Sequence, residues 1–274
     1  MHIQGNTALV TGASRGIGRA IAMELAHHGI HRLLLVARNQ QRLAEVAAEI
    51  EALGVEAIPL ALDLTEPVQV NIAIARAWRD YGPIHLLVNC AGVAYQTPFL
   101  QSHLPNMQAE IAINVLGMYT ITRLIARRMA AQGAGRIVNV SSLMGKVAAP
   151  TMATYSATKF AIVGFTQALR SELAPYNIRV TALLPALTDT DMVRELQWFR
   201  WMKPMTPQQV AKTFVAGLSK ESPEILVGWQ GHLAAWCNRL APPLLEKILQ
   251  MAAPLSQRQP KRVSPLRHAR ASIR

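Results

Sequence analysis

The chain is poor in cysteine, with only Cys90 and Cys237 among its 274 residues. The two lie far apart, and neither belongs to a CxxC pair or a His-rich stretch, so the sequence predicts neither a disulfide framework nor a zinc site. We expect no bound metal. The beginning, MHIQGNTALVTG, lacks the basic and then apolar layout of a signal peptide. We therefore expect a cytoplasmic protein.

Long uninterrupted apolar runs are also missing. The charge-free stretch from Tyr81 to Ala109 contains Gly82, Pro83 and Pro98, which are unlike a spanning helix, so we predict no transmembrane segment. Hydrophobic residues nevertheless make up 51% of the chain and charged residues 16%. This composition argues against global disorder and predicts a sizeable core.

Acidic residues are few, 16 against 28 Lys and Arg, which gives a formal net charge of +12. Half of this excess lies in residues 255 to 274, which contain no acid. We interpret this segment as a basic, solvated and disordered tail, with membrane or phosphate contact as the alternative, and we expect no nucleic-acid partner. Its basic residues are Arg258, Lys261, Arg262, Arg267, Arg270 and Arg274.

Short apolar runs alternate with helical patterns over the first 185 residues. This alternation is typical of βαβ units on a parallel sheet. Helices are predicted near 16 to 29, 40 to 53, 66 to 81, 106 to 132 and 152 to 175. Strands are predicted in TALVTG, LLLVAR, VEAIPLAL, IHLLVNCAG, RIVNVSS and IRVTALLP, and a seventh in EILVG. We predict a doubly wound α/β fold, with a seven-stranded parallel sheet covered by helices on both faces, in one domain over residues 1 to 229.

Residues 188 to 205 break this rhythm, and we interpret them as a flap over the site. Thr206 and Pro207 form an N-cap and first-turn pair that opens a helix to about Ser219. The flap is rich in bulky apolar residues, which suit a bulky apolar substrate but equally suit a flap core or a subunit contact. They are Met192, Val193, Leu196, Trp198, Phe199, Trp201 and Met202.

Residues 230 to 254 are predicted to form an amphipathic helical extension of two halves that meet at Pro242 and Pro243. Each half is too short to span a bilayer, so it docks on the protein or a partner subunit, or lies in a membrane interface where the basic tail adds attraction to anionic lipid. The apolar residues at helical spacing are Leu233, Trp236, Cys237 and Leu240, then Leu244, Leu245, Ile248, Leu249 and Met251.

The first predicted strand ends in TGASRGIG, which places Gly12, Gly16 and Gly18 between a buried strand and a helix start. Glycines there let the backbone turn tightly and approach a pyrophosphate, whose charge is met by amide N–H groups of the helix. A glycine cluster alone is a weak signal, because such turns also use glycine for geometry. Its strand–turn–helix context predicts a Rossmann-type dinucleotide site.

The second predicted strand ends at Arg38, where folds that select NAD carry an acid for the ribose 2′-hydroxyl. A guanidinium cannot accept that bond, but it can bind a 2′-phosphate, and Arg15 could supply a second positive charge. The sequence therefore favours NADP(H), unless Arg38 is only a solvated charge at a strand end.

Tyr155 and Lys159 are one helical turn apart, thirteen residues after Ser142 closes a strand. A phenol has a pKa of about 10, so proton transfer near pH 7 requires that its pKa fall by about 3. A cation such as Lys159 can provide much of this shift. Ser142 would orient the substrate oxygen for hydride attack. The alternative is a buried Tyr beside a snorkelling Lys.

These motifs resemble the short-chain dehydrogenase/reductase family over residues 5 to about 228. TGASRGIG resembles the family's TGxxxGxG, NCAG at 89 to 92 its NNAG, and Asn114, Ser142, Tyr155 and Lys159 its catalytic tetrad. The resemblance implies an NADP(H)-dependent carbonyl reductase or alcohol dehydrogenase, in which Asn114 holds a water and Lys159 also binds ribose. The implied cofactor-binding residues are Gly12, Ser14, Arg15, Gly16, Ile17, Gly18, Arg38, Asp63, Leu64, Asn89, Ala91, Gly92, Tyr155, Lys159, Pro185, Thr188 and Thr190.

The family likeness also implies a homodimer or homotetramer that pairs through the two long helices. Small residues in the second of these helices permit close helix approach. They are Ala157, Ala161, Gly164 and Ala168.

Two departures from the family pattern are visible. Cys90 replaces the second Asn of NNAG, which we expect to loosen a structural hydrogen bond, and Ala186 replaces the Gly of the usual PG pair, which we expect to restrict the backbone near nicotinamide. We expect a bulky apolar carbonyl substrate, such as a 3-oxoacyl chain, a steroid or a retinoid. The alternatives are a catalytically quiet NADP-binding sensor and a membrane-surface scaffold on the same fold.

Overall fold

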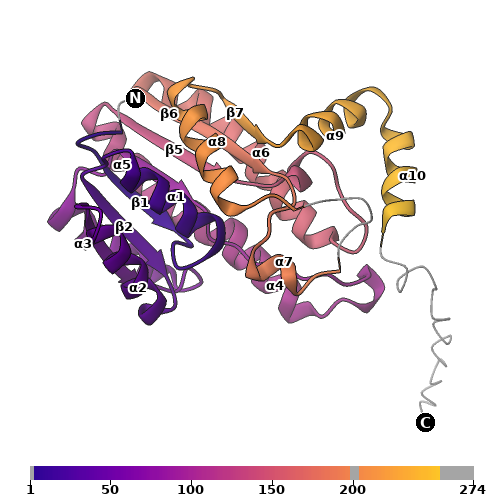
Figure 1. The fold of residues 1–274 in the computed structure, drawn as a ribbon, viewed down its shortest axis with the longest axis horizontal. Helices are drawn as coiled ribbons and strands as arrows, with labels where there is room; N and C mark the ends of the chain where they lie inside the picture. The colour runs from indigo at the N-terminus through magenta and orange to yellow at the C-terminus, as the bar shows by residue number, and fades with distance from the viewer. Residues whose placement is uncertain (1–2, 198–203, 254–274) are drawn as a thin grey trace, which may run out of the picture.

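The structure is a computed structural model that describes residues 3–197 and 204–253. Its seven strands form one sheet in the order β3-β2-β1-β4-β5-β6-β7, and every neighbouring pair is parallel (Figure 1). The predicted doubly wound α/β fold is confirmed. The strands are β1 Thr7–Thr11, β2 Arg32–Ala37, β3 Glu56–Ala61, β4 Leu86–Asn89, β5 Gly135–Val140, β6 Ile178–Pro185 and β7 Glu224–Val227.

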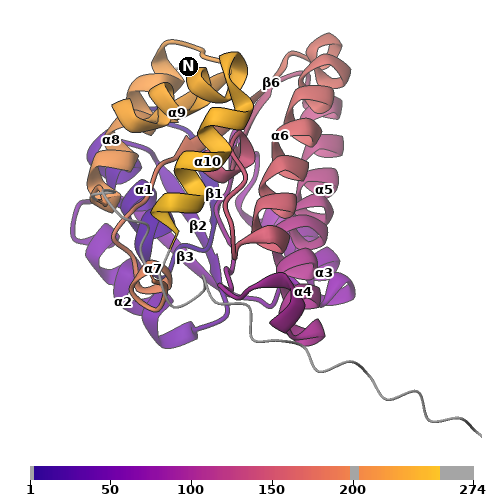
Figure 2. The same cartoon turned by 90° about the vertical axis from the view of Figure 1, so that its right-hand side faces the viewer.

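Helices cover both faces of the sheet, as Figure 2 shows. Helices α1, α2 and α8 pack on one face around Ile21, Leu43 and Phe214, while α3 and α5 pack on the other around Ile74 and Ile121. Apolar residues at helical spacing thus supply the two halves of the core. The helices are α1 Gly16–His27, α2 Gln40–Glu51, α3 Pro67–Tyr81, α4 Leu104–Ile111, α5 Met118–Gln132, α6 Ala153–Leu173, α7 Asp191–Arg194, α8 Pro207–Ser219, α9 Trp229–Leu240 and α10 Pro242–Ala252.

The turn between β1 and α1 requires glycine at two positions. Gly12 has a φ of +70°, and a Cβ there would lie 2.9 Å from the Cα of Ala91 in the loop after β4. A Cβ on Gly18 would clash with the carbonyl oxygen of Gly12. The absence of side chains therefore lets α1 begin against the end of β1 and brings the loops after β1 and β4 together.

The long helix predicted over 106 to 132 is interrupted. Helix α4 ends at Ile111, a π-helical turn covers Ala112–Gly117, and α5 follows. Taken together, the 29 residues Leu104–Gln132 are long and apolar enough to cross a membrane by length and composition alone. The side chains of Ile121, Ile125 and Met129 are fully buried in the core, so here this helix is a wall of the domain.

The flap and the extension follow β6 and β7. The base of the flap is closed by a parallel bridge between Thr188 and Met205. The predicted N-cap is confirmed, since Thr206 Oγ1 accepts a hydrogen bond from the Gln209 N–H at 3.2 Å. Helices α9 and α10 meet where the sequence places Pro242. The predicted tail and the flap residues Trp198, Phe199, Trp201 and Met202 lie outside the described residues.

The Gly18→Ala substitution is expected to lower the free energy of unfolding by about 3 kcal/mol, because the new Cβ would push α1 away from the carbonyl of Gly12. Gly231→Ala is the matched control: Gly231 lies inside α9, and an alanine Cβ there would lie 3.9 Å from Leu143 Cδ1, an ordinary contact. Alanine there should raise stability by about 0.5 to 1 kcal/mol. Urea unfolding of both variants measures the difference, and a stable Gly18→Ala variant would contradict the close approach.

Candidate active site

A cavity of about 570 Å³ lies at the carboxyl ends of the strands, beside β1, which has β2 on one side and β4 on the other. From β1 the chain continues to β2 and β3 on one side and then crosses to β4 on the other side. This is the switch point at which open α/β sheets bind ligands. Most residues singled out from the sequence line it. They are Gly12, Ser14, Arg15, Gly16, Ile17, Gly18, Arg38, Asp63, Leu64, Ala91, Gly92, Ser142, Tyr155, Lys159, Pro185, Thr188 and Thr190, together with Ala186.

Asn89 and Asn114 lie behind the cavity wall. The Asn89 side-chain amide is buried and donates hydrogen bonds to Thr122 Oγ1 and Asn139 Oδ1, both at 2.8 Å. It thus ties β4 to α5 and β5 within the core. Its expected contact with a cofactor stays a prediction.

Asn114 lies in the π-helical turn and holds the loop after β4. Its Oδ1 accepts the Val93 N–H at 2.8 Å, and its Nδ2 donates to the Val93 carbonyl at 2.9 Å and to Thr158 Oγ1 at 3.2 Å. One buried amide therefore joins that loop to α6. This is a positioning role, and the water expected at Asn114 stays a prediction.

Tyr155, Lys159 and Ser142 meet at one side of the cavity. Tyr155 and Lys159 lie on the first turns of α6, and Lys159 Nζ is 5.4 Å from the centre of the Tyr155 ring. Lys159 Nζ also donates to the Val140 carbonyl at 3.2 Å, at the end of β5. Ser142, just beyond β5, hydrogen-bonds the Tyr155 oxygen. The strand end and the helix start thus assemble the three predicted reacting side chains.

The pKa values differ from the expectation that Lys159 lowers the pKa of the Tyr155 phenol toward 7. Burial raises the pKa of Tyr155 to about 12, against the hydrogen bond from Ser142, which lowers it. Burial lowers the pKa of Lys159 to about 8. The expectation was wrong for the protein chain by itself, because both groups lose hydration and the ammonium lies over the ring rather than on the phenol oxygen.

Glu110 is a buried carboxyl near these groups that was not predicted from the sequence. It is on α4, only 2% exposed, and its Oε1 accepts the Tyr95 N–H at 2.8 Å. Burial raises the pKa of Glu110, while the Tyr95 bond and the Lys159 charge lower it. The available signal was its position one helical turn before Asn114. Glu110 fixes the loop that follows Gly92.

Cys90, which stands where the family pattern has Asn, keeps the loop after β4 attached through its backbone. Thr11 Oγ1 accepts the N–H groups of Cys90 and Ala91 at 3.0 and 3.1 Å. Burial raises the pKa of the Cys90 thiol to about 12, so it is protonated and unreactive at neutral pH.

A cluster of guanidinium groups lines the cavity beside the end of β2. Arg15, Arg38 and Arg42 all reach this wall, and Arg42 is a member that was not predicted from the sequence. Asp191 in the flap lies near two of them, with its Oδ2 3.4 Å from Arg15 Nη1 and 3.7 Å from Arg42 Nη1. Arg38 has no such carboxylate contact within the described part of the chain. Burial opposes the lowered pKa of Asp63, which results from hydrogen bonds donated by Thr65 and, to a smaller extent, from the charge of Arg38.

The opposite wall of the cavity is apolar, and the end of α10 packs behind it. Ala252 and Ala253, at the end of α10, form a buried cluster with Ala149 and Met152, and Tyr155 packs against this cluster. Figure 2 shows α10 in front of the strand ends. The apolar residues of this wall are Val93, Ala94, Ile113, Leu143, Met144, Met152, Met192, Val193 and Leu196.

Residues 6–200 match the family model described as short chain dehydrogenase. The chain is 35% identical over 217 residues to a 3-oxoacyl-[acyl-carrier-protein] reductase of Synechocystis sp., covering 77% of this chain and 88% of that one. It resembles a short chain dehydrogenase from Burkholderia cenocepacia in complex with NADP (TM-score 0.80, 30% identity, 91% and 99% of the two chains). It also resembles one from Burkholderia phymatum in complex with NAD (TM-score 0.81, 25% identity, 89% and 96%).

The Lys159→Met substitution is expected to abolish turnover and yet to stabilise the fold at pH 7. The pKa of Lys159 falls from 10.5 to about 8 on folding, so its ammonium form opposes folding below pH 8. After allowance for the lost bond to Val140, the gain should be about 2 kcal/mol.

The sign of this effect can be tested with pH. Between pH 8 and 10.5 only the unfolded wild-type chain holds the Lys159 proton, so wild-type stability should rise relative to the variant. Urea unfolding at pH 7 and pH 9.5 measures both differences. A variant less stable than the wild type at pH 7 would show that the ammonium supports the fold.

Proposed function

The chain belongs to the short-chain dehydrogenase/reductase family, and from this premise we propose that it is an NADPH-dependent carbonyl reductase with Tyr155 as the acid–base group. Family membership makes it an oxidoreductase acting on CH–OH and C=O groups. The cofactor preference, the substrate and the residue roles are the proposal. The observation that carries it is the meeting of Ser142, Tyr155 and Lys159 at the switch-point cavity.

The residues around the cavity fit a dinucleotide. Helix α1 begins at Gly16 without a side-chain cap on its first amides, which leaves N–H groups for a pyrophosphate. Gly12 and Gly18 keep this turn tight against α1 and the loop after β4, because a Cβ on either would clash with backbone. Arg15, Arg38 and Arg42 offer positive charge for a 2′-phosphate. These features support NADP(H), while similar structures are described with both NADP and NAD.

The bound nicotinamide would supply the hydride, and the chain's own residues would handle the proton. Because burial holds the pKa of Tyr155 at about 12, its phenol carries a proton at neutral pH and can donate it to a carbonyl oxygen. The Ser142 hydroxyl would bind the same oxygen and orient it. The Lys159 ammonium would stabilise the phenolate that remains.

The apolar wall supports a bulky apolar carbonyl as the substrate, such as a 3-oxoacyl chain, a steroid or a retinoid. A quiet NADP-binding sensor is disfavoured by the assembled side chains, since sensing alone needs no Tyr–Lys–Ser arrangement. We further propose a dimer or tetramer through α5 and α6. The outward side of α6 exposes Ala157, Gly164 and Phe160, which would let a second helix approach closely.

Tyr155→Phe should reduce kcat/KM more than about a hundredfold, because the phenylalanine ring cannot donate a proton. The Kd for NADPH should change by less than about threefold, since the ring and its packing remain. A panel of 3-oxoacyl, steroid and retinoid carbonyls, followed by NADPH absorbance, provides the substrate. Retention of more than about a tenth of the wild-type kcat/KM would exclude Tyr155 as the main acid–base group.

Arg38→Asp should weaken NADPH binding at least about tenfold and leave NADH binding unchanged or stronger, because a charge-assisted bond to the 2′-phosphate is replaced by repulsion. Arg79→Asp is the matched control, since Arg79 is exposed on α3 and pairs only locally with Asp80. Fluorescence titration of both cofactors gives the Kd values. Equal affinity of the wild type for NADPH and NADH would contradict this role.

A further inference from the structure

Helices α9 and α10 each expose an apolar stripe. We call the two stripes together the C-terminal apolar face, and its members are between 40% and 73% exposed. Within each helix these residues recur every three or four positions and so share one side of that helix, while the non-helical Ala241 separates the two helices. The residues of this face are Trp229, Leu233, Trp236, Leu240, Leu244 and Ile248.

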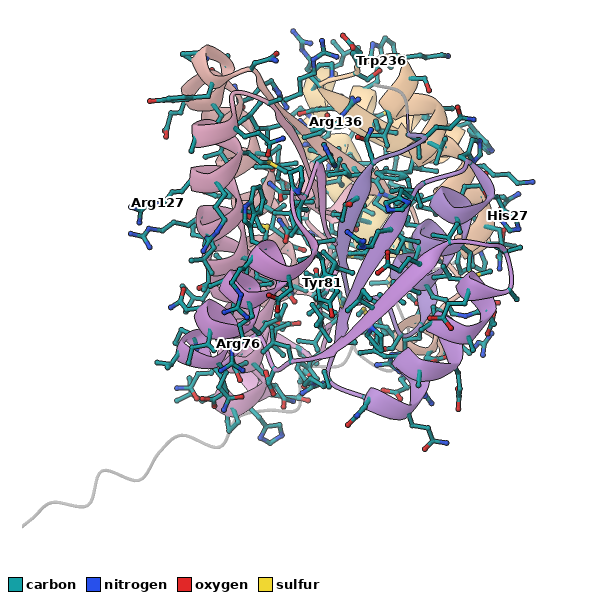
Figure 3. All side chains as sticks on the ribbon, turned by 90° about the vertical axis from the view of Figure 1, so that its left-hand side faces the viewer. His27, Arg76, Tyr81, Arg127, Arg136 and Trp236 are labelled. Atoms are coloured by element: carbon teal, nitrogen blue, oxygen red, sulfur yellow. The ribbon has the colours of Figure 1, made fainter. Side chains whose placement is uncertain are left out.

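The inner side of the same helices is docked on the domain. Leu245, Ala252 and Ala253 are buried, and Asn238 Nδ2 donates to the Lys146 carbonyl at 2.9 Å. The exposed apolar residues therefore lie on the side of the helices that faces away from the domain, while the opposite side is already packed. Figure 3 shows Trp236 at the periphery of the molecule. An exposed apolar stripe of this length marks an interaction surface.

The chain from residue 229 onward carries mainly positive charge. Residues 229 to 274 contain eight basic residues and one acid, Glu246. Arg239 and Lys247 lie within the two helices, and the other six follow in residues 254 to 274. Tryptophan and basic residues beside an apolar stripe are the pattern of helices that lie in a membrane interface.

We propose that the C-terminal apolar face docks on an anionic lipid bilayer, with α9 and α10 lying in the interface and not crossing it. Neither helix is long enough to span the hydrocarbon core, since α9 has 12 residues and α10 has 11. A second copy of the chain is a poorer occupant, because each copy carries eight basic residues and one acid after residue 228, so a symmetric pairing offers little opposite charge.

Docking in this way would bring the cavity to the membrane. The end of α10 packs against Met152 and Tyr155, which line the cavity, so the helix that carries part of the apolar face lies directly behind a wall of the site. If the proposed function is correct, an apolar carbonyl could pass from the lipid to Tyr155 along α10. The bilayer contact itself does not depend on that function.

The test uses the full chain and two sets of vesicles, phosphatidylcholine alone and phosphatidylcholine with about 30% phosphatidylserine. The double variant Trp236→Gln/Leu240→Gln removes apolar area from the face without changing net charge. The control, Val68→Gln/Ile72→Gln, makes the same kind of change at exposed residues of α3. Circular dichroism and NADPH binding establish that both variants are folded.

We expect the wild type to sediment with the anionic vesicles, the face variant to bind them at least tenfold more weakly, and the control to bind like the wild type. Brominated lipid should quench wild-type tryptophan fluorescence. Absence of binding by the intact chain at low salt would overturn the proposal. So would equal binding by the wild type and the face variant, which would leave only electrostatic attraction, or a smaller mass of the face variant by light scattering without vesicle binding, which would indicate a second copy.

Discussion

The site depends on a buried ammonium group. Lys159 is 5% exposed, and burial lowers its pKa to about 8, so the fold holds a charge where hydration is weak. Contacts with the end of β5 and the loop after β4 reduce the cost of burying this charge. The Val140 carbonyl accepts one of its hydrogen bonds, and the glycine at position 92 leaves room, since a Cβ there would lie 3.7 Å from Lys159 Nζ and 3.1 Å from Asn114 Oδ1. A buried ammonium group with a shifted pKa is typical of a functional site, where its stability cost is balanced by its effect on neighbouring reactive groups.

The loop beside Lys159 is held in place by the buried side chains of Asn114 and Glu110. Asn114 pairs with both backbone groups of Val93, and Glu110 binds the Tyr95 N–H, so α4 and the π-helical turn fix the loop after β4 at two points. Residues four apart lie on the same side of a helix, so Glu110 and Asn114 both face this loop. π-Helical turns occur often at functional sites, and the turn Ala112–Gly117 contains Asn114.

The sequence predicted those features that depend on local chemistry. The alternation of apolar runs and helical patterns located the seven strands, and the glycines of TGASRGIG and the Arg38 position located one side of the cavity. The π-helical turn, Glu110 and Arg42 were missed, because their roles depend on which loops tertiary packing brings near. The direction of the Tyr155 pKa was wrong for a similar reason. Helical spacing predicts that Lys159 lies next to Tyr155. Only the folded structure shows how deeply Tyr155 is buried, and this burial has a larger effect on its pKa than the charge of Lys159.

A hydride-transfer site must exclude water and yet admit an apolar substrate, and these demands meet at α10. Water exclusion requires that the wall beside Tyr155 be packed, which Ala252, Ala253 and Met152 provide. Entry requires that the same wall yield to an apolar molecule. Helix α10 packs on the domain through Leu245, Ala252 and Ala253, so the packing behind Tyr155 is apolar. Its exposed side carries Leu244 and Ile248, so the membrane contact proposed above would set an environment as apolar as the substrate beside this part of the site.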